Sequence, residues 1–171
     1  LYTENTLPPV ALTLERLASI PALFRHWSIV LAGNFAGGAV GAVALAVGGV
    51  LEPEAAAAAA GFARHGVYDV TRLRLFFKGA FAGLVVAGVV WVNFAARDTV
   101  TRLLTVYLAF LVVPLGDLFH VVVSFTEAAF LVLVGDLGVV LALTDFVVPV
   151  LLGNTLGGVV LVTVVNYYQT T

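Results

Sequence analysis

Four polar side chains recur at helical spacing within one apolar stretch: Asp117, His120, Ser124 and Glu127, which are three, four and three residues apart. At about 100° per residue they would share one face of a helix. Ionisable groups inside a membrane segment usually face the bundle interior, an ion path or a proton relay. Histidine exchanges protons near neutral pH. The spacing therefore predicts that His120, Ser124 and Glu127 line a pore as a proton relay. The alternative is that His120 and Glu127 only pair with neighbouring helices.

Two asparagines lie in a repeated glycine-rich motif, Gly33-Asn34-Phe35-Ala36-Gly37-Gly38 and Gly153-Asn154-Thr155-Leu156-Gly157-Gly158. An asparagine side chain carries donors and an acceptor, so in an apolar span it needs a protein partner or a pore. Glycines four residues apart let helix backbones pack closely in lipid. Asn34 and Asn154 are therefore candidate pore residues, with hydrogen bonding between helices as the alternative.

These side chains belong to a chain that is too apolar to fold in water. Of its 171 residues, 61% are hydrophobic and 11% are charged, and the mean hydropathy is +1.10. A soluble chain carries about a quarter charged residues. We therefore expect an all-α, multi-pass protein of the cell membrane (plasma or inner), surrounded by a lipid bilayer.

The remaining counts exclude several classes of function. The chain has no cysteine, and its three histidines and ten carboxylates show no metal-ligand spacing, which argues against thiol catalysis and Cys-ligated or clustered metals. A net charge of −2 provides no basic patch for a nucleic acid. The sequence predicts no enzyme activity, no cofactor, no metal site and no nucleic-acid partner.

The elements that position the polar residues are membrane spans, each of which needs about 20 mostly apolar residues. Residues 28–51, 75–96 and 146–168 meet this requirement. Residues 103–135 are also apolar, but Pro114 and Gly116 interrupt them, so we expect one span broken near 114–119. A simple proline kink is the alternative. We treat residues 1–171 as a single transmembrane domain.

The two motifs also indicate an internal duplication. Upstream of each motif, Tyr2-Thr3-Glu4 is echoed by Phe125-Thr126-Glu127. Three crossings separate Asn34 from Asn154, and an odd number places the copies in opposite orientations, as in the inverted repeats of many transporters. The offset between the copies places a counterpart of the 75–96 span before Leu1. We therefore expect a protomer of about six spans, of which this partial chain holds about four.

The isolated basic side chains have weaker signals. Lys78, the only lysine, could snorkel to the membrane boundary from the start of its helix, or attract anions electrostatically at a pore mouth. His26 and His65 lie beside arginines near span ends, so we expect them at the interface.

Several of these segments together resemble the formate/nitrite transporter family. Leu1-Tyr2-Thr3-Glu4-Asn5-Thr6 is similar to the loop of its broken second span, Trp27 with the Gly33 motif to its third, and Lys78-Gly79-Ala80-Phe81 with Trp91 to its fourth. His120 matches the central histidine of its broken fifth span, and the Gly153 motif matches its sixth. The chain departs from the family pattern at Phe119, where the family has Glu, and at Ser124, where it has Asn.

The resemblance implies an aquaporin-like inverted-repeat helical bundle that assembles as a pentamer, a homo-oligomer with one pore per protomer. Thr3 would belong to a gating loop, His120 would be the central pore histidine, and Asn154 would lie beside them. The expected function is a channel or transporter for small monovalent anions such as formate or nitrite, with possible proton coupling through His120. A channel for neutral solutes and a non-transporting membrane scaffold are the alternatives.

Overall fold

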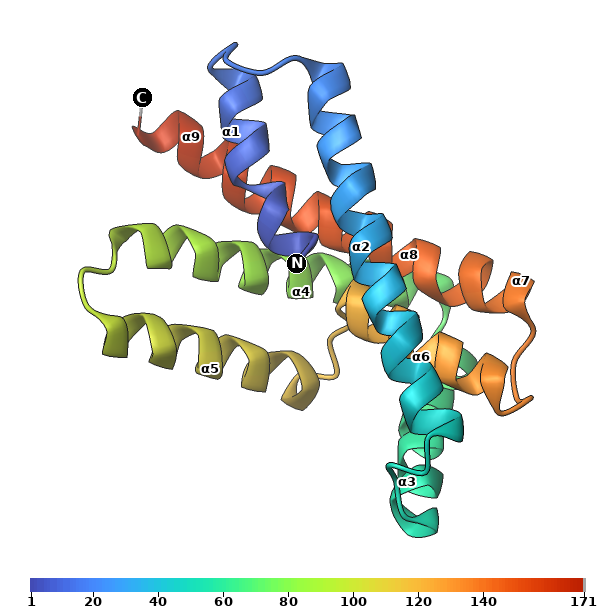
Figure 1. Cartoon of the computed structure of the whole chain (residues 1–171). Helices are drawn as coiled ribbons and strands as arrows, with labels where there is room; N and C mark the ends of the chain where they lie inside the picture. The colour runs from blue at the N-terminus through green and yellow to red at the C-terminus, as the bar shows by residue number, and fades with distance from the viewer. Residues whose placement is uncertain (171) are drawn as a thin grey trace.

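The computed structural model describes residues 1–170, and within them every regular element is helical (Figure 1). The elements, in chain order, are η1 (Thr3–Thr6), α1 (Pro8–Leu14), α2 (Ile20–Val47), α3 (Pro53–Arg64), η2 (His65–Asp69), α4 (Arg72–Ala95), α5 (Thr99–Leu115), α6 (Val121–Leu133), α7 (Val139–Leu141), η3 (Ala142–Val147), α8 (Val148–Leu156), η4 (Gly157–Val164) and α9 (Val165–Thr170). The η1 segment is a 3₁₀ turn, and η2, η3 and η4 are π-helical. The all-α prediction is confirmed.

Three helical stretches of the described chain are long and apolar enough to cross a membrane: Ile20–Val47, Arg72–Ala95 and Val139–Gln169. The helix over the expected 28–51 span begins earlier, at Ile20, because the Ser19 hydroxyl accepts from the Ala22 amide (3.3 Å) and Pro21 lies in the first turn. It also ends earlier, at Val47, since Gly49 has a left-handed φ of 63°.

The span around residues 103–135 is broken, as the sequence predicts. Helix α5 ends at Leu115, just after Pro114, and α6 begins at Val121. Between them Asp117 has φ 49° and His120 has extended backbone. The expected single helical face is therefore wrong for Asp117, because Pro114 and the turn at Gly116 end the helix before it. Only Ser124 and Glu127 lie on α6.

The inverted repeat appears as a pair of equivalent hydrogen bonds. The Asn34 side-chain oxygen accepts from the backbone N–H of Tyr2 at 2.8 Å, and the Asn154 oxygen accepts from the backbone N–H of Val121 at 3.0 Å. Asn34 thus holds the start of a helical segment 32 residues before it, and Asn154 holds the start of one 33 residues before it. Tyr2 therefore corresponds to Val121. The echo of residues 2–4 by 125–127 is a misalignment, since Thr126 lies within α6.

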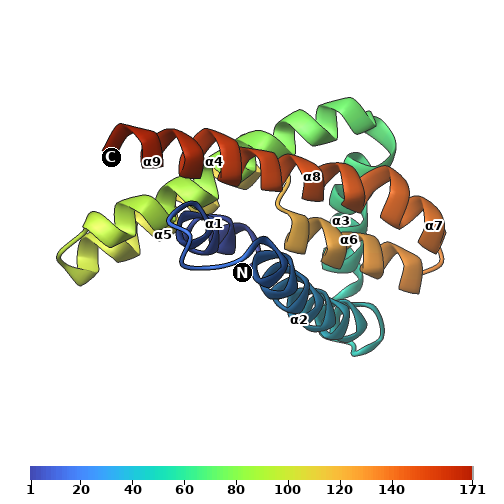
Figure 2. The same ribbon diagram turned by 90° about the horizontal axis from the view of Figure 1, so that it is seen from above.

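Helices α4 and α8 form the most extensive helix packing of the described fold, and Figure 2 shows them crossing. A methyl group on Gly83 of α4 would lie 2.8 Å from the Asn154 Cα and nearer still to its carbonyl oxygen. Gly153 of α8 and Gly157, the first residue of η4, approach the α4 backbone just as tightly, at the carbonyls of Phe76 and Ala80. The predicted close approach of helix backbones is thus present at Gly153 and Gly157. By contrast, no other part of the described chain lies within 4 Å of such a methyl group on Gly33 or Gly37.

Candidate functional site

A cavity of about 160 Å³ lies where the broken span meets α3 and η2. It brings together the four polar residues of the 117–127 segment although they do not share one helix. Its walls are Phe62, His65, Phe110, Val113, Pro114, Asp117, Leu118, Phe119, His120, Val123, Ser124 and Glu127. Most of this lining is apolar, so its few polar groups determine what the cavity can bind.

The buried polar wall of the cavity consists of His120 and Ser124. The exposed fraction is 2% for His120 and 1% for Ser124. Neither ring nitrogen of His120 nor the Ser124 hydroxyl has a hydrogen-bond partner in residues 1–170. The Phe110 ring stands edge-on to the imidazole, with ring centroids 6.2 Å apart. Buried polar groups nearly always have a hydrogen-bond partner. Because these three atoms have none within residues 1–170, they are free to bind a small polar solute.

Glu127 borders the same cavity from the next turn of α6. In the described part of the chain, no hydrogen bond or ion pair involves its carboxyl group. Together with Phe62 it also borders a second cavity, of about 360 Å³, between α2, α3 and α6. Glu127 therefore borders both cavities.

Asn154 lies outside the cavity and supports it from behind. Its side chain is fully buried, and the amide nitrogen donates to the carbonyls of Gly79 and Phe119, both at 2.9 Å. The side-chain oxygen accepts from the Val121 N–H and from the Thr3 hydroxyl, the latter at 3.1 Å. Every position of the amide is used. The structure thus places Asn154, Thr3 and Asn34 in the packing at the starts of two helical segments, at Tyr2 and Val121, and not on the cavity wall.

The exposed end of the cavity carries a charged cluster that the sequence did not reveal. The Lys78 ammonium contacts the Asp117 carboxylate and lies 5.7 Å from the centroid of the Phe119 ring. On the other side, His65 Nε2 lies 3.5 Å from Asp117 Oδ1, and His65 Nδ1 lies 3.2 Å from Asp69. His65, which we expect at the membrane interface, thus also lines the cavity, because η2 turns it that way.

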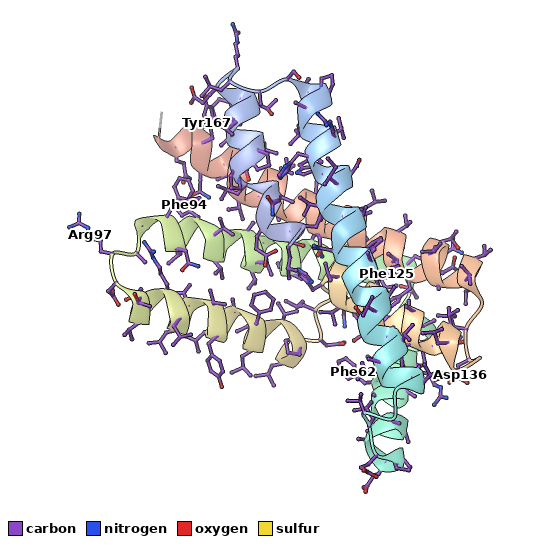
Figure 3. The ribbon with its side chains drawn as sticks, viewed as in Figure 1. Phe62, Phe94, Arg97, Phe125, Asp136 and Tyr167 are labelled. Atoms are coloured by element: carbon purple, nitrogen blue, oxygen red, sulfur yellow. The ribbon has the colours of Figure 1, made fainter. Side chains whose placement is uncertain are left out.

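Three contacts fix the helices around this cluster. Arg64, at the end of α3, pairs with Asp136 after α6, and the Tyr68 hydroxyl donates to the Asp136 carbonyl at 2.6 Å. On the opposite side of α6, Phe125 points toward α2 and stacks on Phe35, with centroids 4.0 Å apart (Figure 3). These contacts hold α3 and α2 against α6, so Phe62 is kept beside the cavity.

No group of three or more His, Cys, Asp or Glu side chains in the part of the chain that the structure describes could hold a metal ion. The chemistry available is hydrogen bonding, charge and proton exchange.

The comparisons with known proteins agree with this architecture. A profile of the family described as "Formate/nitrite transporter" matches residues 1–168. The chain is 28% identical over 173 residues to "Inner membrane protein YfdC" of Escherichia coli (strain K12), covering 99% of this chain and 54% of that protein. The chain thus spans about half the length of this curated relative.

Two solved structures share the fold. An "FNT family ion channel" superposes with a TM-score of 0.86 at 22% identity, covering 100% of this chain and 69% of that one. A "Pentameric formate channel with formate bound" superposes with a TM-score of 0.73 at 22% identity, covering 86% of this chain and 66% of that one. With the matched residues extending over nearly the whole sequence, this multi-pass membrane chain belongs to the formate/nitrite transporter family.

Proposed function

We propose that the chain forms part of a transmembrane pathway for small monovalent anions such as formate or nitrite. The observation that carries the proposal is the buried His120 imidazole, whose two nitrogens have no partner within residues 1–170 and which lines a cavity of about 160 Å³. A buried polar group left unpaired is costly. A solute with hydrogen-bonding oxygens would remove that cost while it passes.

In this proposal His120 exchanges a proton with the anion. A bare anion in an apolar cavity loses its hydration without compensation. When the imidazolium gives its N–H proton to an anion oxygen, the N–H bond breaks and an O–H bond forms. The products are neutral imidazole and a neutral weak acid, which crosses the apolar wall at lower cost. Once the solute has passed His120, the acid returns its proton to the imidazole. The O–H bond breaks, and the anion and the imidazolium are restored.

The other polar residues take supporting roles. The unpartnered Ser124 hydroxyl supplies a second hydrogen-bond donor beside His120, and Glu127 is a second group able to hold a proton on the same cavity. Lys78 attracts anions toward the exposed end. Thr3 and Asn154 hold the break before α6 in place, which keeps the imidazole facing the cavity, and Asn34 holds the start of the matching segment at Tyr2.

The relatives extend the proposal to the complete protein. One solved relative is described as a pentameric channel with formate bound, which supports a small carboxylate as substrate and a homo-pentamer as the assembly. The curated relative is described as an inner membrane protein, which supports that membrane as the location. We propose both for this protein.

One observation favours a second candidate, a channel for small neutral solutes. Glu127 brings an unpaired carboxyl group to the cavity, and its charged form would repel an anion. In a neutral-solute channel, His120 and Ser124 would orient the solute by hydrogen bonds and no proton would move.

Liposome flux of the complete protein separates these functions. We predict that formate flux rises as the pH falls through the ionisation of His120, because the imidazolium fraction rises. His120→Asn keeps a donor but cannot titrate, so its flux should lose this pH dependence. His26→Asn is the matched control, since His26 is exposed and bonds Asn5 at 2.9 Å, away from the cavity.

Protein-free liposomes supply the background permeation of formic acid, which must be subtracted at each pH. If His120→Asn keeps the parent's rate and pH profile, proton exchange by His120 is wrong. Flux of a neutral solute without formate flux would favour the second candidate, and no flux of either solute would leave a membrane scaffold.

A further inference from the structure

The Asp117 carboxylate lies between two basic side chains at the exposed end of the cavity. The Lys78 ammonium contacts one of its oxygens, and His65 Nε2 lies 3.5 Å from the other. The exposed side-chain fractions are 29% for Lys78 and 47% for both His65 and Asp117. All three side chains are therefore only partly covered by the rest of the described chain.

This arrangement matches what a small carboxylate needs. Lysine supplies only donors, and the facing His65 nitrogen can supply another, so the two side chains converge on two oxygens of one planar group. The Phe119 ring below the ammonium, 5.7 Å from its centroid, closes the apolar side. A free formate or nitrite ion carries the same pair of oxygens as the Asp117 side chain.

The backbone conformation positions the Asp117 carboxylate between Lys78 and His65. Asp117 has φ 49°, a left-handed conformation that aspartate, asparagine and glycine adopt most readily. Its N–H donates to the Pro114 carbonyl at 3.1 Å, and the flanking N–H groups of Gly116 and Leu118 donate to Val112 and Val113 at 2.8 and 2.9 Å. The carboxylate is thus held by a fixed turn, and a tethered group competes with free ligand at high effective concentration.

We propose that the Lys78–His65 pair is an anion-binding site at the cavity end and that Asp117 occupies it as a tethered substitute for the transported anion. The proposal rests on the anion pathway proposed above and adds a residue that sets its apparent affinity. A free anion reaches His120 only after it displaces the Asp117 carboxylate. The other charged group facing this cluster is Asp69, which holds the far nitrogen of His65, and Glu127 lines the cavity beyond it.

The test removes the tethered charge without disturbing the turn. Asp117→Asn and Asp117→Gly both suit the left-handed backbone, so each variant of the complete protein should remain monodisperse in detergent. In formate flux across liposomes, each should lower KM by about tenfold, while the maximal rate stays within about twofold. Asp145→Asn is the matched control, since it removes a carboxylate from an ion pair with Arg72 outside the cavity; its KM should not change.

A second readout does not depend on transport. Binding of ¹³C-formate to the solubilised protein, followed by NMR, should tighten about tenfold in Asp117→Asn, and Lys78→Gln added to that variant should abolish the gain. Unchanged formate binding in Asp117→Asn, or a gain that survives Lys78→Gln, would overturn the proposal. If binding tightens as expected but no variant transports formate, the anion site stands and the proposed transport function fails.

Discussion

The Asn154 amide makes four hydrogen bonds to three separate segments: η1, α4 and the break before α6. In the Asn154→Leu variant, the Val121 N–H and the Phe119 carbonyl would be buried without partners, whereas the Gly79 carbonyl would keep its hydrogen bond within helix α4. Each such group costs about 1–3 kcal/mol, so we predict a loss of about 3–5 kcal/mol. Thermal unfolding of the complete protein in detergent measures it.

Asn34 is the matched control for this prediction. Its side chain is partly exposed, and the structure gives it one hydrogen bond, from the Tyr2 N–H. Asn34→Leu should therefore cost only about 1 kcal/mol. Equal losses in the two variants would show that the network around Asn154 does not carry the extra stability.

At this scale the sequence revealed some site residues and not others. Spacing alone singled out His120, Ser124 and Glu127, because polar groups in an apolar run stand out. The charged cluster was not predictable, since His65 and Lys78 meet Asp117 only through the fold, from 52 and 39 residues away in sequence. No periodicity connects residues on three different elements.

Among the elements, the crossing of α4 and α8 sets the tightest constraint. A methyl group on Gly83 meets the backbone of Asn154, and backbone cannot rotate away as a flexible side chain can. We predict that Gly83→Ala destabilises the protein by about 1–3 kcal/mol, the usual range for overpacking, as measured by thermal unfolding in detergent.

Gly88, five residues further along α4, provides the control. Apart from its own helix, no described atom lies within 4 Å of a methyl group there. Gly88→Ala should be neutral or stabilise the protein by about 0.5–1 kcal/mol through helix propensity. A loss as large as that of Gly83→Ala would point to helix distortion instead of contact with α8.

Helix α5 depends on a cap outside the membrane spans. The Asp98 carboxylate accepts from the Thr101 hydroxyl at 2.7 Å and from the Thr101 N–H at 2.8 Å. These two bonds lower the pKa of Asp98 below its usual range. Because the folded pKa is the lower one, the stabilisation is present above the unfolded value, about 3.9, and is lost as the pH falls through the folded pKa.

We predict that Asp98→Ala increases amide exchange at Thr101 roughly fivefold at neutral pH, the usual effect of losing an N-cap. The difference from the parent should shrink at the lowest pH, where the parent's carboxyl is protonated. Asp98→Asn, which caps without titrating, should stay close to the parent at neutral pH and show no such change. Exchange at Thr101 that is the same in all three proteins would rule out the cap.

The elements themselves were largely predictable from local chemistry. Pro114 and Gly116 determined the break, since proline removes a donor and the turn at Gly116 ends the helix. The start of α2 was not predicted, because counting charge-free residues ignores the cap at Ser19, and Arg25 and His26 lie within the first turns.

Over the whole molecule, the two halves agree more closely than the repeated motifs suggested. Each asparagine holds the start of a helical segment of the same length, and the loop that follows has the same length too. The matching stretches are residues 2–14 with 121–133 and residues 15–19 with 134–138. The sequence predicted the order of the repeat but not its register, since residues 2–4 resemble 125–127 whereas Tyr2 corresponds to Val121 in the structure.

The π-helical segment η3 explains the single residue by which the halves differ. From the start of the following helix, Asn34 is 14 residues after Ile20, whereas Asn154 is 15 residues after Val139. One additional residue in a regular α-helix would rotate everything beyond it by about 100°. The i→i+5 bonding of a π turn takes up that residue locally, and η3 lies within this interval, at Ala142–Val147. The duplicated halves thus preserve the mark of a one-codon insertion or deletion in their history, and a correct alignment of one half with the other places its gap inside this helix, not in the loop before it.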